Sequence, residues 1–270
     1  MNTSSKKNLH LSRYFVLMVT TSLMLLTSCT KKNQFQTIEQ PSLAAPPAEP
    51  PFSDETSQNE TTPDPVDEAP ITSVPVTPVY KMEALSWESP KRPDAVNWST
   101  HAFQVVDKEV FDKLDKASDA DFFCPKYKWL ERNQRVNFWG QLFSAVSYYE
   151  SGYDPTSRMQ ETTMGSDPIT GKPVYSEGLL QLSYQDIQWA PYCEFDWSKD
   201  KNLSPTDPKK TILSPYKNLS CGIKIMARQI ASKGSIILRS GVYWAVLKDG
   251  GRYEKIDEIA AITKRLSFCN

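Results

Sequence analysis

A helical pattern that ends in a glutamate, Ala145-Val-Ser-Tyr-Tyr-Glu150-Ser-Gly-Tyr-Asp-Pro155, decides what this 270-residue chain can be. Gly152 and Pro155 are typical of the end of a helix, which places Glu150 in its last turn. Upstream, apolar residues recur at the spacing of one helix face: Phe138, Leu142, Ala145, Val146 and Tyr149. The pattern therefore predicts an amphipathic helix that carries a carboxylate at its C-terminal end.

The position of Glu150 predicts that its side chain holds a proton. The negative end of the helix dipole disfavours a second negative charge there. Tyr148, Tyr149 and Tyr153 surround the carboxyl group with aromatic rings, and reduced hydration also favours the protonated form, so we expect a raised pKa. Glycosidic cleavage needs such an acid to protonate the leaving oxygen. Glu150 is thus the candidate catalytic acid, and the alternative is an exposed helix-end glutamate without a role.

The remaining patterns predict a mainly α fold with a loop-rich insertion. The insertion runs from Ser157 to Tyr175, and its segment from Asp167 to Gly171 is typical of a turn or small hairpin. Gly234 would end the helix that follows the insertion. Further helices are expected over residues 219–230, 242–247 and 256–266.

Composition divides the chain into a tether and one folded domain. Of the 20 prolines, 12 fall between Pro41 and Pro93, and residues 33–80 contain eight acidic residues but no Lys or Arg. Such a tract has too little apolar surface to offset the entropy of ordering it. We therefore expect a Pro- and acid-rich disordered tether over residues 29–94 and a folded domain over residues 95–270, where most aromatic residues lie.

The first 28 residues have the pattern of a lipoprotein signal peptide. Basic residues precede an apolar stretch from Tyr14 to Leu26, whose 13 residues are short for a membrane-spanning helix. Leu26-Thr-Ser-Cys29 resembles a bacterial lipobox, in which the cysteine is lipidated. Thr30 follows rather than the Asp typical of inner-membrane retention. We expect an outer-membrane lipoprotein that faces the periplasm, and the alternative is an uncleaved membrane anchor.

The other four cysteines are an even set in a chain expected in an oxidising compartment: Cys124, Cys193, Cys221 and Cys269. Three pairings are possible. We favour Cys193–Cys221 with Cys124–Cys269, because the second bond would join the two ends of the domain. Zinc binding is the competing interpretation, but no Cys-x-x-Cys pair is present.

Histidine content and charge exclude several functions. The chain has only His10, in the signal peptide, and His101, so a histidine-rich metal centre cannot form and a Ser-His-Asp enzyme would depend on His101 alone. Residues 95–270 hold 23 basic and 21 acidic residues, a net charge near +2. With no run of basic residues, nucleic acid is not an expected partner. We expect a monomer without metal or organic cofactor.

Three motifs in order resemble the soluble lytic transglycosylase family, which shares its fold with goose-type lysozyme. The first is the segment 145–155. The second is Ser176-Glu-Gly-Leu-Leu-Gln-Leu-Ser183, and the third is the Asn-then-Gly helix start in Leu213-Ser-Pro-Tyr-Lys-Asn-Leu-Ser-Cys-Gly-Ile-Lys-Ile225. The similarity runs from about residue 138 to residue 231.

The resemblance implies a lysozyme-like domain that acts on the glycan strands of peptidoglycan. Members cleave the β-1,4 bond between N-acetylmuramic acid and N-acetylglucosamine and leave a 1,6-anhydro product. Glu150 would act first as the acid and then as the base. Ser176, Gly178 and Gln181 would line the floor of the glycan cleft, and Tyr243 would lie near Glu150 and orient it.

The chain departs from the family pattern in three places. Its Val242-Tyr-Trp-Ala-Val246 lacks the asparagine and final glycine of the Ala-Tyr-Asn-Ala-Gly motif, and Leu180 replaces a methionine. Glu150 and Gln181 are 31 positions apart, a longer separation than we expect in the family. The extra length is the 157–175 insertion.

Two other functions remain open. A lysozyme-type muramidase would hydrolyse the same bond, usually with a second carboxylate, for which the candidates are Glu161, Asp167, Glu177 and Asp186. A non-catalytic glycan-binding lipoprotein would instead use exposed aromatic rings, for which the candidates are Trp139, Trp189, Trp197 and Trp244.

Overall fold

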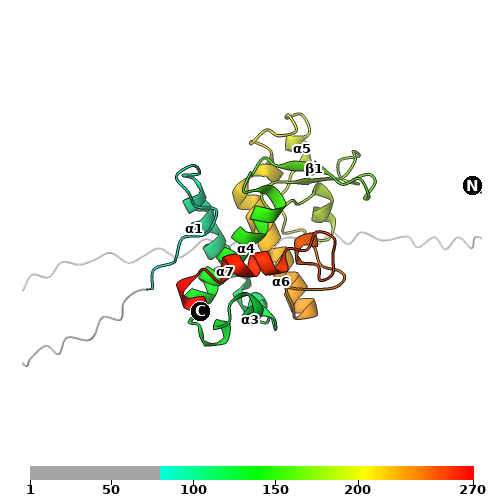
Figure 1. Cartoon of the computed structure of the whole chain (residues 1–270). Helices are drawn as coiled ribbons and strands as arrows, with labels where there is room; N and C mark the ends of the chain where they lie inside the picture. The colour runs from blue at the N-terminus through cyan, green and yellow to red at the C-terminus, as the bar shows by residue number, and fades with distance from the viewer. Residues whose placement is uncertain (1–79) are drawn as a thin grey trace, which may run out of the picture. The chain divides into compact units, whose positions relative to one another are not determined.

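The computed structural model describes residues 80–270 and shows a mainly helical, lysozyme-like domain (Figure 1). The predicted signal peptide, Cys29 and most of the predicted tether lie outside the described residues. Within residues 80–270, no helix has the length and apolar character needed to cross a membrane. The helices and strands are α1 (Ala95–Val105), α2 (Phe111–Leu114), α3 (Ala120–Phe123), α4 (Arg132–Ser151), β1 (Arg158–Gln160), β2 (Tyr175–Glu177), α5 (Trp197–Asp200), α6 (Pro215–Lys233) and α7 (Ile256–Thr263).

Short helical turns connect these elements. One is a π-helical turn that continues α1, and the others are 3-10 helices. They are η1 (Val106–Val110), η2 (Tyr127–Trp129), η3 (Tyr184–Gln188), η4 (Thr211–Leu213), η5 (Ala245–Leu247) and η6 (Ser267–Cys269).

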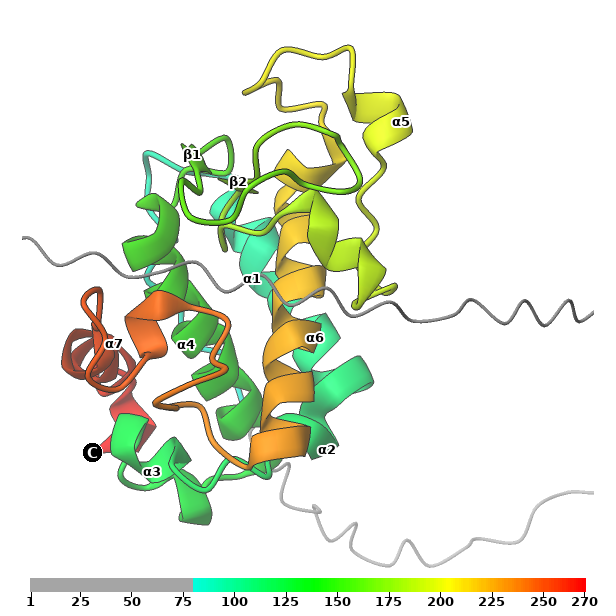
Figure 2. The ribbon, with the colours of Figure 1, turned by 90° about the vertical axis from the view of Figure 1, so that its right-hand side faces the viewer.

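Helix α4 is the centre of the domain. The side chains of Glu131 and Gln134 form a capping box at its start, and every residue from Val136 to Ser147 is buried. The predicted helix is confirmed, but it is covered on all sides rather than amphipathic, because α1 and α7 both pack against it (Figure 2). A Cβ atom at Gly140 would lie 2.5 Å from the ring of Phe103, so this glycine permits the close approach of α1.

The segment 80–87 runs along α4 and belongs to the folded domain. Leu85 and Trp87 are buried, so this segment, which was predicted to be part of the tether, packs in the folded domain. Polar side chains of α4, spaced along one face, accept backbone N–H groups of this segment. The bonds are Glu83 to Asn137 (2.6 Å), Ser86 to Gln141 (3.0 Å) and Trp87 to Ser144 (3.0 Å).

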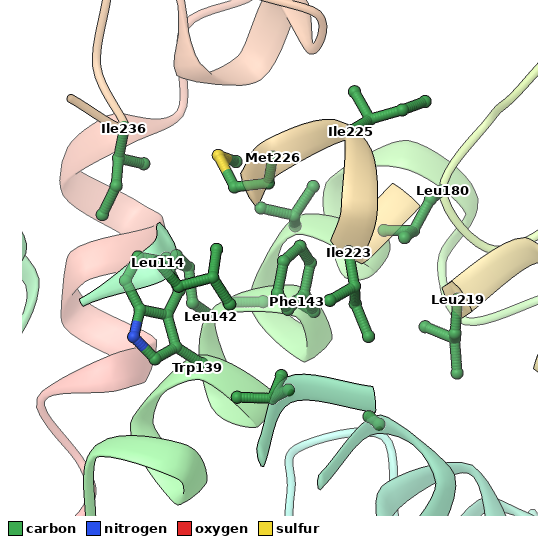
Figure 3. Packing of buried hydrophobic residues seen from close by; sticks show 14 of the residues in the cluster. Leu114, Trp139, Leu142, Phe143, Leu180, Leu219, Ile223, Ile225, Met226 and Ile236 are labelled. Carbon is green, nitrogen blue, oxygen red and sulfur yellow. The ribbon is translucent and has the colours of Figure 1, made fainter. Parts of the chain in front are cut away.

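Helix α6 provides the other half of the core, where its apolar side chains meet those of α4 (Figure 3). Gly234 ends it in a left-handed conformation, as predicted. The helix predicted over residues 242–247 is wrong, because only η5 forms there. The indole of Trp244 donates to the carbonyl of Leu180 (2.9 Å), and Trp244 itself has an extended backbone conformation.

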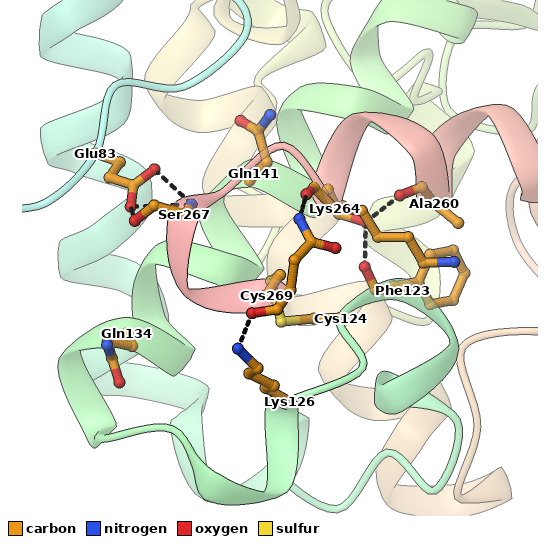
Figure 4. Close-up of a disulfide and its surroundings, with 12 residues drawn as sticks. Glu83, Phe123, Cys124, Lys126, Gln134, Gln141, Ala260, Lys264, Ser267 and Cys269 are labelled. Carbon is orange, nitrogen blue, oxygen red and sulfur yellow. Dashed lines mark hydrogen bonds between the residues drawn. A yellow bond between two sulfur atoms is a disulfide. The ribbon is translucent and has the colours of Figure 1, made fainter.

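Both predicted disulfides are present. Cys124 and Cys269 join the loop after α3 to the C-terminus, with Cα atoms 4.7 Å apart (Figure 4). Cys193 and Cys221 join the loop after η3 to α6, with Cα atoms 4.6 Å apart. The first bond closes a separation of 145 residues, and long closed loops gain most from a cross-link in the chain-entropy account.

Candidate active site

Glu150 lies in the last turn of α4, where the chain reverses direction. Gly152 (φ 61°) and Tyr153 (φ 68°) both have left-handed backbone conformations, so the helix cannot continue. The hydroxyl of Ser151 donates to the carbonyl of Leu179 (2.9 Å). This bond fixes the end of α4 against the second motif, and with it the position of Glu150.

Burial, and to a lesser extent the negative charge of Glu161, raise the pKa of Glu150 to about 8. The raised pKa was predicted, and desolvation was one of the two predicted causes. The influence of Glu161 is an additional cause that the structure reveals. At neutral pH most of the Glu150 side chain is therefore the protonated acid, although part of it faces solvent.

The insertion forms a small antiparallel sheet of β1 and β2, in which Met159 is paired with Ser176. The hydroxyl of Ser176 donates to Glu161 Oε1 at 2.5 Å. Ser176 was expected to line the floor of the glycan cleft, and in the structure its hydroxyl orients the Glu161 carboxylate. Successive strand residues point to opposite faces, so Glu177 points away from the face that carries Ser176 and Glu161.

Two of the four candidate second carboxylates support the fold instead. Asp167 is buried, and its Oδ1 atom accepts the N–H groups of Ile169 and Thr170 (2.8 and 3.1 Å), which shapes the turn of the insertion. Glu177 is also buried and forms ion pairs with Lys210 and Arg158. Neither carboxylate contributes to the shifted pKa of Glu150.

Asp186, the third candidate, holds Tyr243. The Tyr243 hydroxyl donates to Asp186 Oδ2 at 2.5 Å, and the same oxygen accepts the N–H of Ser183 at 2.8 Å. Burial raises the pKa of Asp186 above its usual value. Burial and the charges of Asp186, Glu150 and Glu161, in that order, raise the pKa of Tyr243. The structure thus brings Tyr243 and both glutamates into one site.

Gly178 and Gln181 shape the turn after β2 from within. Gly178 has φ 82°, and a Cβ atom there would lie 2.4 Å from the Nδ2 atom of Asn218. Gln181 is buried with φ 49°, and its amide donates to the carbonyl of Gly178 (2.8 Å). Asn218 in turn accepts the N–H of Leu180 (2.8 Å). The Asn-then-Gly helix start therefore anchors the turn whose Leu179 carbonyl accepts a hydrogen bond from Ser151, the residue after Glu150.

The candidate stacking tryptophans differ in exposure. Trp139 and Trp244 are buried in the core and Trp197 is partly buried. Trp189 is 39% exposed, and its ring centroid lies 6.2 Å from that of Tyr243. Among these four, only Trp189 offers an open ring beside the site. Trp129 is 78% exposed in η2, but it precedes the start of α4, whereas Glu150 lies in the last turn of that helix.

The fold and the paired carboxylates define a lysozyme-like protein, and they support a role in cleaving or binding a glycan. No protein-family model and no curated protein match the chain. Solved structures of DslA from Bdellovibrio do match it, in wild-type form and as two glutamate-to-glutamine variants. They are 29% identical, cover 71% of this chain and all of DslA, and have TM-scores of 0.57 to 0.58.

The DslA variants add one observation on the site. The two glutamates replaced in them are 11 positions apart in that chain. Glu150 and Glu161 are also 11 positions apart. The two replaced glutamates of DslA thus have the same spacing in sequence as Glu150 and Glu161.

Proposed function

We propose that this protein cleaves the β-1,4 bond between N-acetylmuramic acid and N-acetylglucosamine in peptidoglycan by hydrolysis. One observation carries the proposal. Burial, with the charge of a second carboxylate, Glu161, raises the pKa of Glu150 to about 8, so Glu150 is protonated at neutral pH. A protonated acid and a second carboxylate in one site are the parts of a glycoside hydrolase.

The proton of Glu150 would pass to the glycosidic oxygen as the bond to C1 of the muramic residue breaks. The positive charge that develops on that sugar would be stabilised by the Glu161 carboxylate, which Ser176 orients through its hydrogen bond. Glu161 would then take a proton from a water molecule, whose hydroxide adds to C1. One product has a new reducing end at N-acetylmuramic acid, and the other has a new non-reducing end at N-acetylglucosamine. Glu161 returns its proton to Glu150 through solvent.

A lytic transglycosylase reaction is the second candidate, and the ordered motifs favour it. After the first step, the Glu150 carboxylate would remove the proton of the C6 hydroxyl, whose oxygen closes a 1,6-anhydro ring on C1. The neighbouring N-acetyl group would assist departure. This route needs only Glu150, and it leaves the interaction of Glu161 with Glu150 without a function.

Mass spectrometry of the products from digested sacculi separates the two reactions. The enzyme would be residues 80–270, with Glu150→Gln as the inactive control. Reducing-end products that disappear in Glu161→Gln support hydrolysis. Anhydro products, one water lighter, that persist in Glu161→Gln would establish the transglycosylase. De-N-acetylated sacculi sharpen the result, because only the assisted route requires the N-acetyl group of the muramic residue.

We also propose that Cys29 is lipidated and that the tether holds the domain in the periplasm at the outer membrane. The signal pattern and the two disulfides, which suit an oxidising compartment, support this. Labelled palmitate should enter the full chain in a bacterial host, and Cys29→Ser should abolish the label. Label retained in that variant would contradict the proposal.

A further inference from the structure

The turn between β2 and η3 holds the chain at two points of the site. The hydroxyl of Ser151 donates to the carbonyl of Leu179 (2.9 Å). The indole of Trp244 donates to the carbonyl of the next residue, Leu180 (2.9 Å). Ser151 directly follows the candidate acid in α4, and Trp244 directly follows Tyr243. Two neighbouring carbonyl groups therefore fix the candidate acid and Tyr243 against the same turn.

The ring of Tyr243 is held in place by its neighbours. Its centroid lies 4.9 Å from that of Trp244, which is buried, and 6.2 Å from that of Trp189. A hydroxyl hydrogen rotates about the C–O bond to suit its acceptor. Because the ring is held, the direction of the O–H bond is the main freedom that remains, and the strongest acceptor in reach determines it.

Asp186 is that acceptor. The distance of 2.5 Å between the Tyr243 hydroxyl and Asp186 Oδ2 is typical of a charge-assisted hydrogen bond. The N–H of Ser183 donates to the same oxygen at the start of η3, which fixes the carboxyl group. Asp186 is buried, and among residues 80–270 no Lys or Arg forms an ion pair with it. Its charge therefore has no neutralising partner and is left to hold the phenol proton.

The other charged and titratable side chains around this pair come from α4, the residue after β1, the loop after η3, and α6. In that order they are Glu150, Glu161, Tyr192 and Arg228. Arg228 is engaged elsewhere, since it donates to the carbonyl of Trp189 and lies 5.3 Å from the centroid of that ring. Burial and then Asp186 raise the pKa of Tyr243 most, and Glu150 raises it more than Glu161 does.

The single proton of the Tyr243 phenol decides what its oxygen can do. A phenol that donates to Asp186 presents only lone pairs to the rest of the site. We infer that Asp186 is a positioning residue, which takes the proton of Tyr243 so that the phenol oxygen accepts a hydrogen bond from the Glu150 acid. The inference rests on the proposed function and adds the group that keeps its acid in the proton-bearing form. A hydrogen bond to the neutral form disfavours ionisation.

Asp186→Asn changes this arrangement without removing the cap of η3. The amide oxygen can still accept the N–H of Ser183, but it is a weaker acceptor than a carboxylate. When Glu150 ionises in this variant, the phenol proton turns to its carboxylate and stabilises the charged form, so the pKa of Glu150 falls. Burial and Glu161 are the causes that raise the pKa of Glu150, and Asp186 is not among them. A lowered pKa therefore passes through Tyr243.

Carbon NMR of the Glu150 carboxyl group, followed against pH in the full chain, tests the inference. The signal is assigned by its loss in Glu150→Gln. Asp186→Asn should lower the titration midpoint by about one pH unit, the size of one hydrogen bond. Tyr243→Phe, which removes the acceptor of the acid, should lower it too, and adding Asp186→Asn to Tyr243→Phe should cause no further change. Asp249→Asn, at an exposed aspartate outside the site, is the matched control and should keep the wild-type midpoint.

Two results would overturn the inference. A wild-type midpoint in Asp186→Asn would mean that the proton of Tyr243 does not depend on Asp186. A shift of the same size in the presence and absence of Tyr243→Phe would mean that Asp186 acts by its own charge. If Asp186→Asn does not fold, Tyr243→Phe decides alone, because it leaves the bond from Ser183 to Asp186 intact, and an unchanged midpoint there also rejects the role.

The titration needs no substrate, so it separates this inference from the proposed function. A shifted midpoint supports the role of Asp186 even if no strand is cleaved. On sacculi, kcat/KM reports the ionisation of the free enzyme. Its alkaline limb should move to lower pH in Asp186→Asn, with KM unchanged, because the buried Asp186 acts on Tyr243 and not on the sugar. Cleavage with an unchanged limb and midpoint would leave the proposed function standing and reject the positioning role.

Discussion

Glu161 and Glu177 flank the same small sheet but have opposite surroundings. Glu161 is half-buried and accepts a hydrogen bond from a neutral hydroxyl, that of Ser176. Glu177, which follows Ser176 in β2, is buried. It forms ion pairs with Arg158, its partner in the strand register, and with Lys210. Because two cations neutralise Glu177, its charge is used to hold the fold. The charge of Glu161 is left to act on Glu150.

The role of each carboxylate follows from the groups that contact it and not from its sequence separation from Glu150. A carboxylate paired with a buried ammonium is costly to disturb, so Glu177 serves the fold. A carboxylate held only by a hydroxyl has no neutralising partner, so its negative charge can act on a neighbouring acid. Four substitutions or titrations test this difference.

Glu150→Gln should have the largest effect on activity. The amide keeps the shape of the side chain but cannot donate the proton, so cleavage of sacculi should fall about 10³-fold, within the usual range for general acid catalysis. Glu194→Gln, at an exposed glutamate away from the site, is the matched control and should retain full activity. Product release measured by chromatography would disagree with the assignment if Glu150→Gln kept a tenth of the wild-type rate or more.

Glu161→Gln should reduce activity about 10²-fold, because it removes the general base and leaves the acid in place. The thermal midpoint of unfolding should stay within the error of the wild type, since Ser176 can still donate to the amide oxygen. Circular dichroism on heating measures that midpoint. A variant that loses stability and activity together would show that Glu161 has a structural role like that of Glu177.

Glu177→Gln should show the reverse pattern. Loss of the carboxylate leaves the buried Lys210 ammonium without its counter-charge, which should lower the free energy of unfolding by about 3 kcal/mol. Activity at a temperature where the variant is folded should remain within a few-fold of wild type. Urea unfolding gives the stability. An unchanged midpoint would mean that the pair contributes nothing to the fold, and an inactive but stable variant would move Glu177 into the site.

The local parts of this comparison could be predicted from the sequence. The apolar spacing and stop residues identified α4 with Glu150 at its end, and α6 and α7 were found in the same way. The count of cysteines and their positions led to both disulfides. A local pattern carries this information because the partners of each residue lie one or two helical turns away, or because only a few pairings exist.

The non-local parts could not be predicted. The bonds between α4 and residues 80–87 join polar groups more than 50 positions apart, and such pairs leave no periodic trace. The choice of Glu161 among four acidic residues depends on its contact with Ser176 and on the cations of Glu177. The register of β1 and β2 places Arg158 opposite Glu177, and the distant Lys210 is the second cation. The helix predicted over residues 242–247 does not form for the same reason. The bond from the Trp244 indole to the distant Leu180 carbonyl outweighs the local preference for a helix.

The smallest expected effect, a shift in the pKa of Glu150, is the most specific test. Because Glu150 must be protonated to act, wild-type activity should decline as pH rises through about 8. Its folded pKa lies above the ordinary value, so the protonated acid stabilises the fold fully at low pH, and this contribution is lost as pH rises through the folded pKa. Glu150→Gln should therefore gain stability relative to wild type between about pH 4.5 and 8.

Glu161→Gln should lower the pKa of Glu150, because one of the two groups that raise it becomes neutral. The alkaline limb of the residual activity should move to lower pH, and carbon NMR of the Glu150 carboxyl should show the same direction. Glu177→Gln should leave both unchanged, since its charge is already neutralised by Lys210 and Arg158. If the two variants shifted the alkaline limb equally, the field of the whole hairpin, rather than the position of Glu161, would set the pKa of the acid.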